Sequence, residues 1–245
     1  MLKKVKYLLL VLLLAFSGLC AADYEQKIDR RFELAAGGSL DLSSINGEIS
    51  ITTTGGTAVD VKAVKKSDHK GEIEKVEVVF EPGKDFLKVY VKYSRRNTRA
   101  RVDFKVAVPE RLARAHFKSV NGRIDCTGKF SDLTLKTVNG RIDFSGSFRN
   151  AVLEAVNGKI DLSQEPLLAG NLTVSTVNGA VDLELNRKSA FAIEGETING
   201  SIDNEFGLEV KRHLVGRSLE GKVNGGGKYK VSVETVNGSI DISKI

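Results

Sequence analysis

The chain is poor in several residue types that mark particular kinds of site. Its 245 residues include no tryptophan, two cysteines, three prolines and three histidines. Two cysteines are too few for a disulfide framework or a cysteine-rich metal centre. The histidines, His69, His116 and His213, are isolated in the sequence, with no metal-ligand spacing and no Ser/His/Asp grouping. These shortages argue against a metalloenzyme and against a serine hydrolase.

The N-terminus has the three parts of a secretory signal peptide. Lysines precede an apolar run over 8–16, and small residues follow it. The run is too short to cross a bilayer comfortably, which disfavours an uncleaved anchor. We predict an exported protein of the periplasm or cell surface, with residues 1–22 removed by cleavage after Ala22. A lipoprotein acylated at Cys20 is an alternative that the bulky Leu19 fits badly.

The charge of the chain is mild. Cleavage would remove three lysines and lower the formal charge from +6 to +3. A nucleic-acid-binding protein needs a concentrated basic surface, so we predict no nucleic-acid partner.

One short phrase, Val-Asn-Gly-x-Ile-Asp, recurs through the chain. Its copies begin at positions 120, 138, 156, 177 and 236, with an Ile-Asn-Gly copy at 198 and a divergent one at 45. From Asn121 onward the asparagines are 18, 18, 21, 21 and 38 residues apart. Such a period indicates stacked units, none of which can bury its own apolar face.

Around each copy, apolar and polar residues alternate as in β-strands. Within 133–146, the pattern predicts that Leu133, Leu135, Ile142 and Phe144 point inward. Asn-Gly interrupts the alternation as a corner, because both residues tolerate positive φ. We predict an all-β, single-stranded β-helix or solenoid of 18–21-residue coils. An antiparallel meander or prism of Asn-Gly hairpins also fits, since Asn-Gly is a strong hairpin signal.

The uniform asparagines favour the β-helix. In stacked coils their amides would pair from coil to coil as an internal ladder, as side-chain amides do in cross-β stacks. A hairpin needs no such uniformity, and it does not explain Val or Ile before every Asn. The predicted ladder consists of Asn121, Asn139, Asn157, Asn178, Asn199 and Asn237.

The coils are regular only in the second part of the chain. We predict a signal peptide over 1–22, an N-terminal β region of long coils with a hairpin over 23–115, and regular solenoid repeats over 116–245, the last two forming one continuous domain. The last coil ends at Ile245 with no evident cap, so its strand edge predicts end-to-end self-association.

Outward carboxylates recur in every copy. Solenoid glycosidases use paired outer-face acids, but here no Asp/Glu pair stands out from the repeat. The glycine-rich nonapeptide spacing of calcium-binding β-rolls is absent. We therefore predict no enzyme, no catalytic residues, no metal and no cofactor.

A basic loop is the best local candidate for ligand contact. It carries Arg95, Arg96, Arg99 and Arg101. Guanidinium groups suit phosphates and carboxylates, so the candidate partners are a surface glycan, an anionic lipid or an envelope protein. A solvated charged loop is the alternative.

Several motifs together resemble a known family. They are Val-Ala-Val-Pro-Glu at 106–110, the Thr-Val-Asn-Gly copies, and Leu-Glu-Gly-Lys-Val-Asn-Gly-Gly-Gly at 219–227 before the last copy. Over 35–245 the chain resembles a bacterial candidate-adhesin domain family of unknown function. The resemblance implies an exported β-helix-like stack, and it carries over no catalytic residues.

The expected function is that of an exported, non-enzymatic, adhesin-like solenoid that binds a surface or a glycan. The first alternative is a structural or regulatory envelope protein acting through a protein or membrane partner. The second is a carbohydrate-active enzyme on a β-helix.

Overall fold

The computed structural model describes residues 24–95, 98–110 and 112–245. The predicted signal peptide, with Cys20 and Ala22, and Arg96 of the basic loop lie outside the described residues. The described part contains one short helix, α1 (Lys70–Ile73), and otherwise consists of strands and turns. The prediction of an all-β fold is confirmed. No helix in the described ranges is long and apolar enough to cross a membrane.

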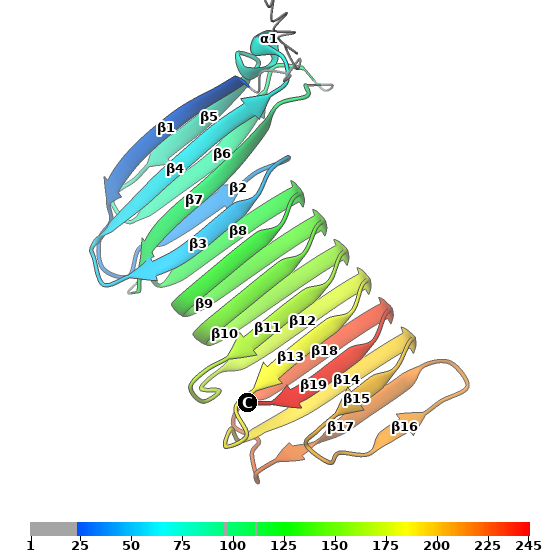
Figure 1. The fold of residues 1–245 in the computed structure, drawn as a ribbon. Coiled ribbons are helices and arrows are strands. Elements are labelled where there is room, and N and C mark those ends of the chain that lie inside the picture. Colours follow the sequence, from blue (N-terminus) through cyan, green and yellow to red (C-terminus); the bar gives the residue numbers. More distant parts are fainter. Residues whose placement is uncertain (1–23, 96–97, 111) are drawn as a thin grey trace, which may run out of the picture.

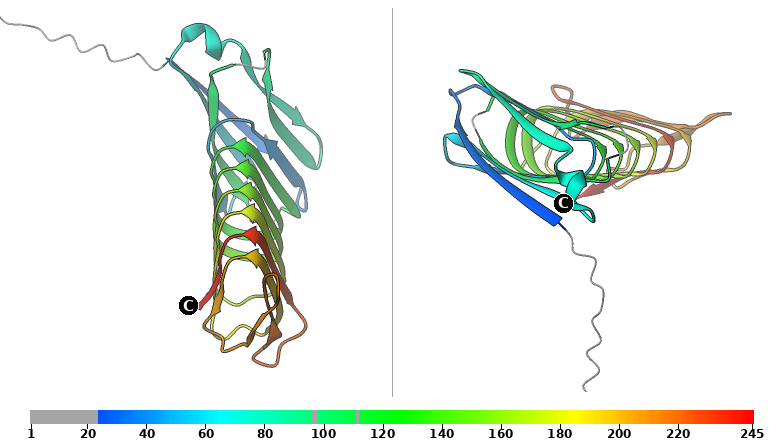
Figure 2. Two further views of the ribbon diagram at one scale, coloured as in Figure 1. Left: turned by 90° about the vertical axis from the view of Figure 1, so that its right-hand side faces the viewer. Right: turned by 90° about the horizontal axis from the view of Figure 1, so that it is seen from above.

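The strands form two layers that face each other across the core (Figures 1 and 2). β9 (Ile124–Asn139) and β10 (Ile142–Asn157) each bend and run through both layers, so the pairing is continuous. The first layer has the spatial order β5 (Val76–Pro82), β6 (Phe86–Tyr93), β2 (Ser39–Ser43), β8 (Arg114–Asn121), the second halves of β9 and β10, β12 (Asn171–Asn178), β18 (Lys230–Asn237), β14 (Phe191–Asn199), β17 (Arg217–Val223) and β16 (Val210–Arg212).

The second layer runs alongside in the same direction. Its spatial order is β1 (Tyr24–Glu33), β4 (Ala58–Ser67), β7 (Arg101–Pro109), β3 (Ile49–Thr54), the first halves of β9 and β10, β11 (Ile160–Gln164), β13 (Val181–Leu185), β19 (Ile240–Lys244) and β15 (Ile202–Asn204).

The repeats pair in parallel and in register. Ile142 lies opposite Ile124 on one side and Ile160 on the other, so equivalent positions of successive coils are direct neighbours. Parallel pairing requires a crossover rather than a tight hairpin. The β-helix prediction is therefore confirmed for the repeats, and the alternative of Asn-Gly hairpins is wrong. Among the described strands, antiparallel pairs occur only toward the two ends, as in β5–β6, β1–β4–β7 and β14–β17–β16.

The core is a narrow band of apolar side chains between the layers. Leu133, Leu135, Ile142 and Phe144 are all buried, as the alternation predicts. Burying an aliphatic or aromatic side chain of this size stabilises a fold by about 1.5–3 kcal/mol. No single coil supplies more than a few such side chains, so stability depends on each coil contacting the next.

The corner glycines are needed for a reason other than the one predicted. Among the Asn-Gly corners of the repeated phrase, only Gly47 has a positive φ, 115°, and none of the asparagines does. Instead, a Cβ on Gly140 would collide with the carbonyl oxygen of Gly122, and one on Gly158 with that of Gly140. The positive-φ explanation is therefore wrong for the repeats: glycine is required because adjacent corners touch through their backbones.

The chain does not add coils in sequence order. The last coil, β18 and β19, lies between the β12–β13 coil and the β14–β15 coil, as the red strands between yellow and orange ones show in Figure 1. At the other end, β2 and β3 lie between the β6–β7 coil and the β8–β9 coil. The expectation that the coil ending at Ile245 forms the exposed end is therefore wrong.

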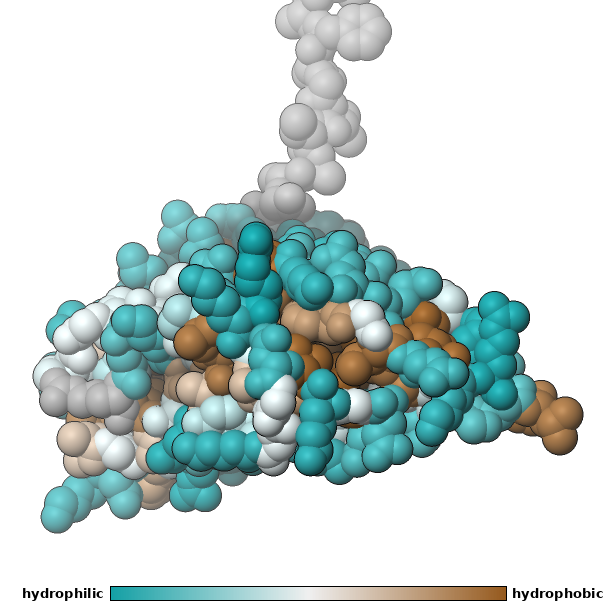
Figure 3. Space-filling view, turned by 90° about the horizontal axis from the view of Figure 1, so that it is seen from below, coloured by the Kyte–Doolittle hydropathy of each residue, from teal (hydrophilic) through white to brown (hydrophobic). Residues whose placement is uncertain are grey.

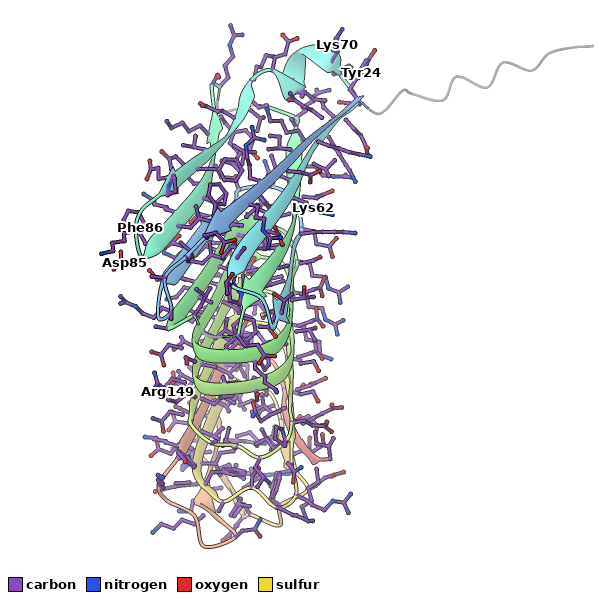
Figure 4. The ribbon with its side chains drawn as sticks, turned by 90° about the vertical axis from the view of Figure 1, so that its left-hand side faces the viewer. Tyr24, Lys62, Lys70, Asp85, Phe86 and Arg149 are labelled. Carbon is purple, nitrogen blue, oxygen red and sulfur yellow. The ribbon has the colours of Figure 1, made fainter. Side chains whose placement is uncertain are left out.

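Different elements form the two ends of the stack. At one end, α1 and the start of β1 lie together, as Tyr24 and Lys70 show in Figure 4. β1 is an exposed strand whose sequence, YEQKIDRRFE, is rich in charge, which discourages pairing with another chain. At the other end, β16 and β17 form an antiparallel hairpin beside β14. Self-association through a strand edge stays a prediction.

Candidate functional site

The asparagines of the repeats form a hydrogen-bonded row along one corner of the stack. Asn139 Nδ2 donates to Asn121 Oδ1 (2.8 Å), and Asn157 Nδ2 to Asn139 Oδ1 (2.9 Å). The row continues through Asn178, and then through Asn237 to Asn199, because the last coil is inserted. Asn46 extends it at the other end by accepting from Asn121 (2.9 Å).

This row lies on the surface and not in the interior. The ladder asparagines from Asn121 onward are exposed or half-buried, so the expected internal position is wrong. A side-chain amide carries two N–H donors and two acceptor lone pairs. Each link of the row uses one donor of one residue and one lone pair of the next. Along the row, one N–H and one lone pair of each amide therefore remain to face solvent or a ligand.

The glycine after each asparagine and the threonine two residues before most of them have clear structural roles, whereas the preceding Val or Ile has none. Thr137 is buried, and its Oγ1 donates to the carbonyl of Gly122 (3.2 Å). Thr176 donates in the same way to Gly158 (3.1 Å). The glycines permit close stacking. The exception is the Val or Ile before each asparagine, whose side chain lies outside the buried core and, being apolar, can form no hydrogen bond.

These valines and isoleucines form an exposed apolar row beside the amides. The six most open members are 38–49% exposed: Ile45, Val120, Val138, Val156, Val177 and Ile198. Adjacent coils lie about 4.8 Å apart, so seven coils extend the row over about 29 Å. Scattered apolar side chains are normal on a surface, whereas a continuous row indicates an interaction site. We call the apolar row and the amide row together the asparagine corner.

The described residues of the basic loop lie at one end of this corner. Val102 N–H donates to the carbonyl of Asn46 (2.9 Å), so the loop between β6 and β7 takes the place of an Asn-Gly corner. Arg95 and Arg99 are exposed there, whereas Arg101 Nε lies 3.7 Å from Asp103 Oδ2. The backbone N–H of Arg99 donates to Glu72 (3.0 Å). The structure thus places the predicted asparagine ladder and the described arginines of the basic loop next to each other at one edge of the molecule.

On the second layer, a row of cations alternates with a row of aspartates. Arg123 Nε lies 2.7 Å from Asp125 and 2.9 Å from Asp143 of the next coil. Arg141 likewise contacts Asp143 (2.7 Å) and Asp161 (2.9 Å). Each arginine thus joins two coils. Exposed pairs of this kind contribute about 0.2–1 kcal/mol each, so this surface serves mainly to align the stack.

Toward the β15 end the same aspartate row loses its cations. Asp182 contacts Lys159, whereas Asp241 and Asp203 follow Ser239 and Ser201 in their coils. Burial, followed by repulsion from Asp182, raises the pKa of Asp241. Within the described ranges, no three His, Cys, Asp or Glu residues are grouped so that they could hold a metal ion.

Two of the histidines are not isolated in the fold. His116 Nδ1 lies 3.3 Å from Asp41 Oδ2, and Ser43 Oγ donates to the same carboxylate (3.2 Å). The hydrogen bond from His116 is the main reason that the pKa of Asp41 lies below its ordinary value. In a catalytic triad the hydroxyl would contact the imidazole instead. His213 Nε2 lies 2.8 Å from Ser218 Oγ.

Two exposed apolar surfaces were not predicted from the sequence. The apolar row was visible as Val or Ile before every asparagine, but that position was used only as evidence for stacking. The second surface is the tip of the β16–β17 hairpin, where Leu214 and Val215 are exposed. Its signal was two apolar residues inside a short basic segment, Lys-Arg-His-Leu-Val-Gly-Arg over 211–217.

The profile of the family described as Toastrack DUF4097 matches residues 24–243. The chain belongs to this family. Membership confirms the resemblance on which the sequence analysis relied, and it covers both the irregular N-terminal part and the regular repeats. No curated protein matches the chain.

A solved structure shows the same fold. It is a candidate cell adhesion protein from Clostridium sporogenes ATCC 15579, similar with a TM-score of 0.58 at 13% identity, covering 91% of this chain and 100% of that one. At this identity the likeness concerns fold alone. A candidate adhesin from Bacteroides fragilis NCTC 9343 matches with a TM-score of 0.46 at 14% identity, covering 89% of this chain and 97% of that one, which is too low a score to support an argument about the fold.

Proposed function

We propose that this protein is an exported, non-enzymatic, adhesin-like protein of the bacterial cell envelope, and that it binds a surface glycan along its asparagine corner. The observation that carries the proposal is the exposed apolar row beside a row of amides with free donors and acceptors. The Toastrack family membership and a structural relative described as a candidate cell adhesion protein support it.

The chemistry of the corner suits a polymer of sugars. A pyranose ring presents C–H groups on its faces and hydroxyls on its rim. The apolar row offers a partner for the faces, and the outward N–H and lone pair of each amide offer partners for the hydroxyls. Because the same groups recur about every 4.8 Å, a repeating ligand can contact several coils at once. Several weak contacts then add up to a useful affinity.

The basic loop lies at the end of this corner and suits acidic sugars. Arg95 and Arg99 are exposed beside the coil that carries Asn46. A guanidinium binds a carboxylate through two parallel hydrogen bonds. We therefore expect a preference for polysaccharides that bear carboxylates or phosphates.

The test is binding of residues 23–245 to a panel of envelope polysaccharides and host glycans, with and without calcium. Val138→Ser combined with Val156→Ser should weaken a saturable interaction at least tenfold, because it interrupts the apolar row. The matched control is Val152→Ser, which changes a half-buried valine on the outer side of the first layer. Arg95→Ala combined with Arg99→Ala should weaken binding to acidic glycans only.

Three outcomes would contradict the proposal. The first is that no glycan on the panel binds. The second is that the double Val→Ser variant binds as well as the parent protein. The third is that the bound polysaccharide is shortened by the purified protein, which would indicate the carbohydrate-active enzyme instead.

A further inference from the structure

The β16–β17 hairpin ends in an apolar tip that the fold does not use. Leu214 is fully exposed, and the side chain of Val215 is 72% exposed. The hairpin projects beyond the edge of the stack (Figure 1), and the view from below shows an apolar projection at the same margin (Figure 3). The backbone N–H of His213 donates to the carbonyl of Gly216 (3.1 Å), which closes the turn.

The identity of these two residues has no explanation in turn chemistry. Hairpin turns favour Asn, Asp, Gly and Pro, which either tolerate positive φ or preset the backbone. Here Gly216 takes the positive φ of 86° that the turn needs. Any polar residue would serve at positions 214 and 215. Leu and Val there expose apolar surface to water without stabilising the hairpin.

The charged residues next to the tip in the chain are basic. The segment 211–217 carries Lys211, Arg212 and Arg217 and no carboxylate. Lys211 and Arg212 are exposed, whereas Arg217 is half-buried and donates to the carbonyl of Gly200. Arg212 and Arg217 lie directly opposite each other across the hairpin. Cations thus stand on both strands just behind the two apolar side chains.

The hairpin is held so that its tip points away from the fold. β17 pairs with β14 as far as the register Thr197 opposite Arg217, where β14 reaches the asparagine corner. Gly216 lies against the backbone of β14, where a Cβ would collide with the carbonyl oxygen of Thr197. Residues 213–215 therefore extend past the last member of the apolar row. The tip continues that row outward from the end of the stack.

From this arrangement we propose that the β16–β17 tip docks on anionic phospholipid bilayers. Leu214 and Val215 enter the boundary between headgroups and acyl chains, and Lys211 and Arg212 contact the anionic headgroups. A bilayer fits better than a protein pocket because the apolar tip is small and the charged residues of the segment 211–217 are all basic. Each Lys or Arg near an anionic surface strengthens binding about fivefold.

Negative charge elsewhere on this end restricts the docking angle. The outer side of the first layer carries Glu194, Glu196, Glu220 and Glu234 in and beside the hairpin's base. An anionic bilayer repels these carboxylates, so the hairpin approaches with its tip first and not lying flat. The asparagine corner then stands away from the bilayer and stays open to another ligand.

The absence of tryptophan from the chain permits a direct test. A Leu214→Trp variant of residues 23–245, the segment that contains every described strand, carries a single tryptophan at the tip. On mixing with vesicles of equal parts phosphatidylglycerol and phosphatidylcholine, its emission should shift to shorter wavelength, and brominated lipid should quench it. Leu167→Trp, at another exposed apolar position, is the matched control and should respond to neither.

Vesicle co-sedimentation supplies the binding measurement. Leu214→Ser combined with Val215→Ser should weaken binding at least tenfold, and Leu167→Ser should leave it unchanged. Lys211→Gln combined with Arg212→Gln should weaken it about 25-fold, the product of two fivefold effects, and added salt should weaken it further. Equal binding of parent and tip variants, or equal binding to pure phosphatidylcholine vesicles, would overturn the proposal. Glycan binding is measured with other variants, so the two proposals fail separately.

Discussion

Replacing Gly158 by alanine tests the claim that the corners touch through their backbones. The φ angle at Gly158 lies outside the left-handed region, so alanine introduces no strain of its own there. The added Cβ would collide with the carbonyl oxygen of Gly140. Neither group is the end of a flexible side chain, so the two coils must separate at this corner.

The magnitude follows from what the separation breaks. Overpacking a tight contact costs about 1–3 kcal/mol. Separating the two coils also stretches the hydrogen bond that joins them at this corner, from Gly140 N–H to the carbonyl of Asn157 (3.1 Å). That bond contributes about 0.5–1.5 kcal/mol. Together the two costs should lower the free energy of unfolding by about 2–4 kcal/mol.

The assay is urea unfolding of residues 23–245, followed by far-ultraviolet circular dichroism and by tyrosine fluorescence. Coincident transitions allow the midpoint shift to be converted to free energy. Gly55→Ala is the matched control, because nothing lies within 4 Å of a Cβ built there, and it should change stability by less than about 0.5 kcal/mol. Equal midpoints for Gly158→Ala and the parent protein, or equal losses in both variants, would refute the reasoning.

Three further results are expected. Asn157→Leu removes two links of the amide row, but water can reach the stranded groups, so the loss should be about 1–2 kcal/mol; an unchanged unfolding midpoint would show that the row adds no stability. Asp241 has a raised pKa in the fold, so its ionised form is disfavoured there relative to the unfolded chain. Asp241→Asn should therefore raise the urea midpoint at neutral pH, with the gain vanishing below pH about 4, where the carboxyl is protonated in both states; a gain that persists in acid would contradict this cause. The thiol of Cys126 is buried, and burial raises its pKa. It should resist alkylation in the native protein and react once urea unfolds the chain, so rapid native labelling would contradict the packing.

The repeat period was enough to predict the fold. Leu135 and Ile142 alternate with polar neighbours, and the same alternation returns 18 residues later at Leu153 and Ile160. Side chains that repeat in this way can be buried only if coils stack. The two-layer, parallel arrangement follows from that requirement, whatever the local turn geometry.

The order of the coils could not be predicted in the same way. The copy beginning at Val236 has the same Asn-Gly-Ser-Ile-Asp as the one beginning at Ile198, so either could occupy a given place in the stack. What distinguishes them is the hairpin that follows β15 and occupies the free edge of β14. This is a contact between distant segments, and no local pattern encodes it.

The candidate site was predicted in part. The amide row was predicted because Asn occurs at the same position of every repeat, and stacked coils bring these positions together. The exposure of Val138 was missed because alternation breaks at the corner, where a β-branched residue could face either way. The exposure of Leu214 was missed because Leu214 and Val215 lie outside the repeats, so no periodic pattern shows which way their side chains face. A binding surface can form from residues that do not recur periodically in the sequence.

The insertion of β18 and β19 between earlier strands also restricts the order in which the chain can fold. Because β18 and β19 separate β13 from β15, residues 191–204 cannot take their final neighbours until residues 230–244 exist. In a chain that emerges from a ribosome or a secretion channel with its N-terminus first, the edges of β13 and β15 must stay unpaired until β18 and β19 appear. Otherwise they pair with other strands and must separate again. A nascent chain that ends before residue 230 thus lacks a coil from the inside of the stack, not from its end. The stack is completed only when residues 230–244 take their place inside it.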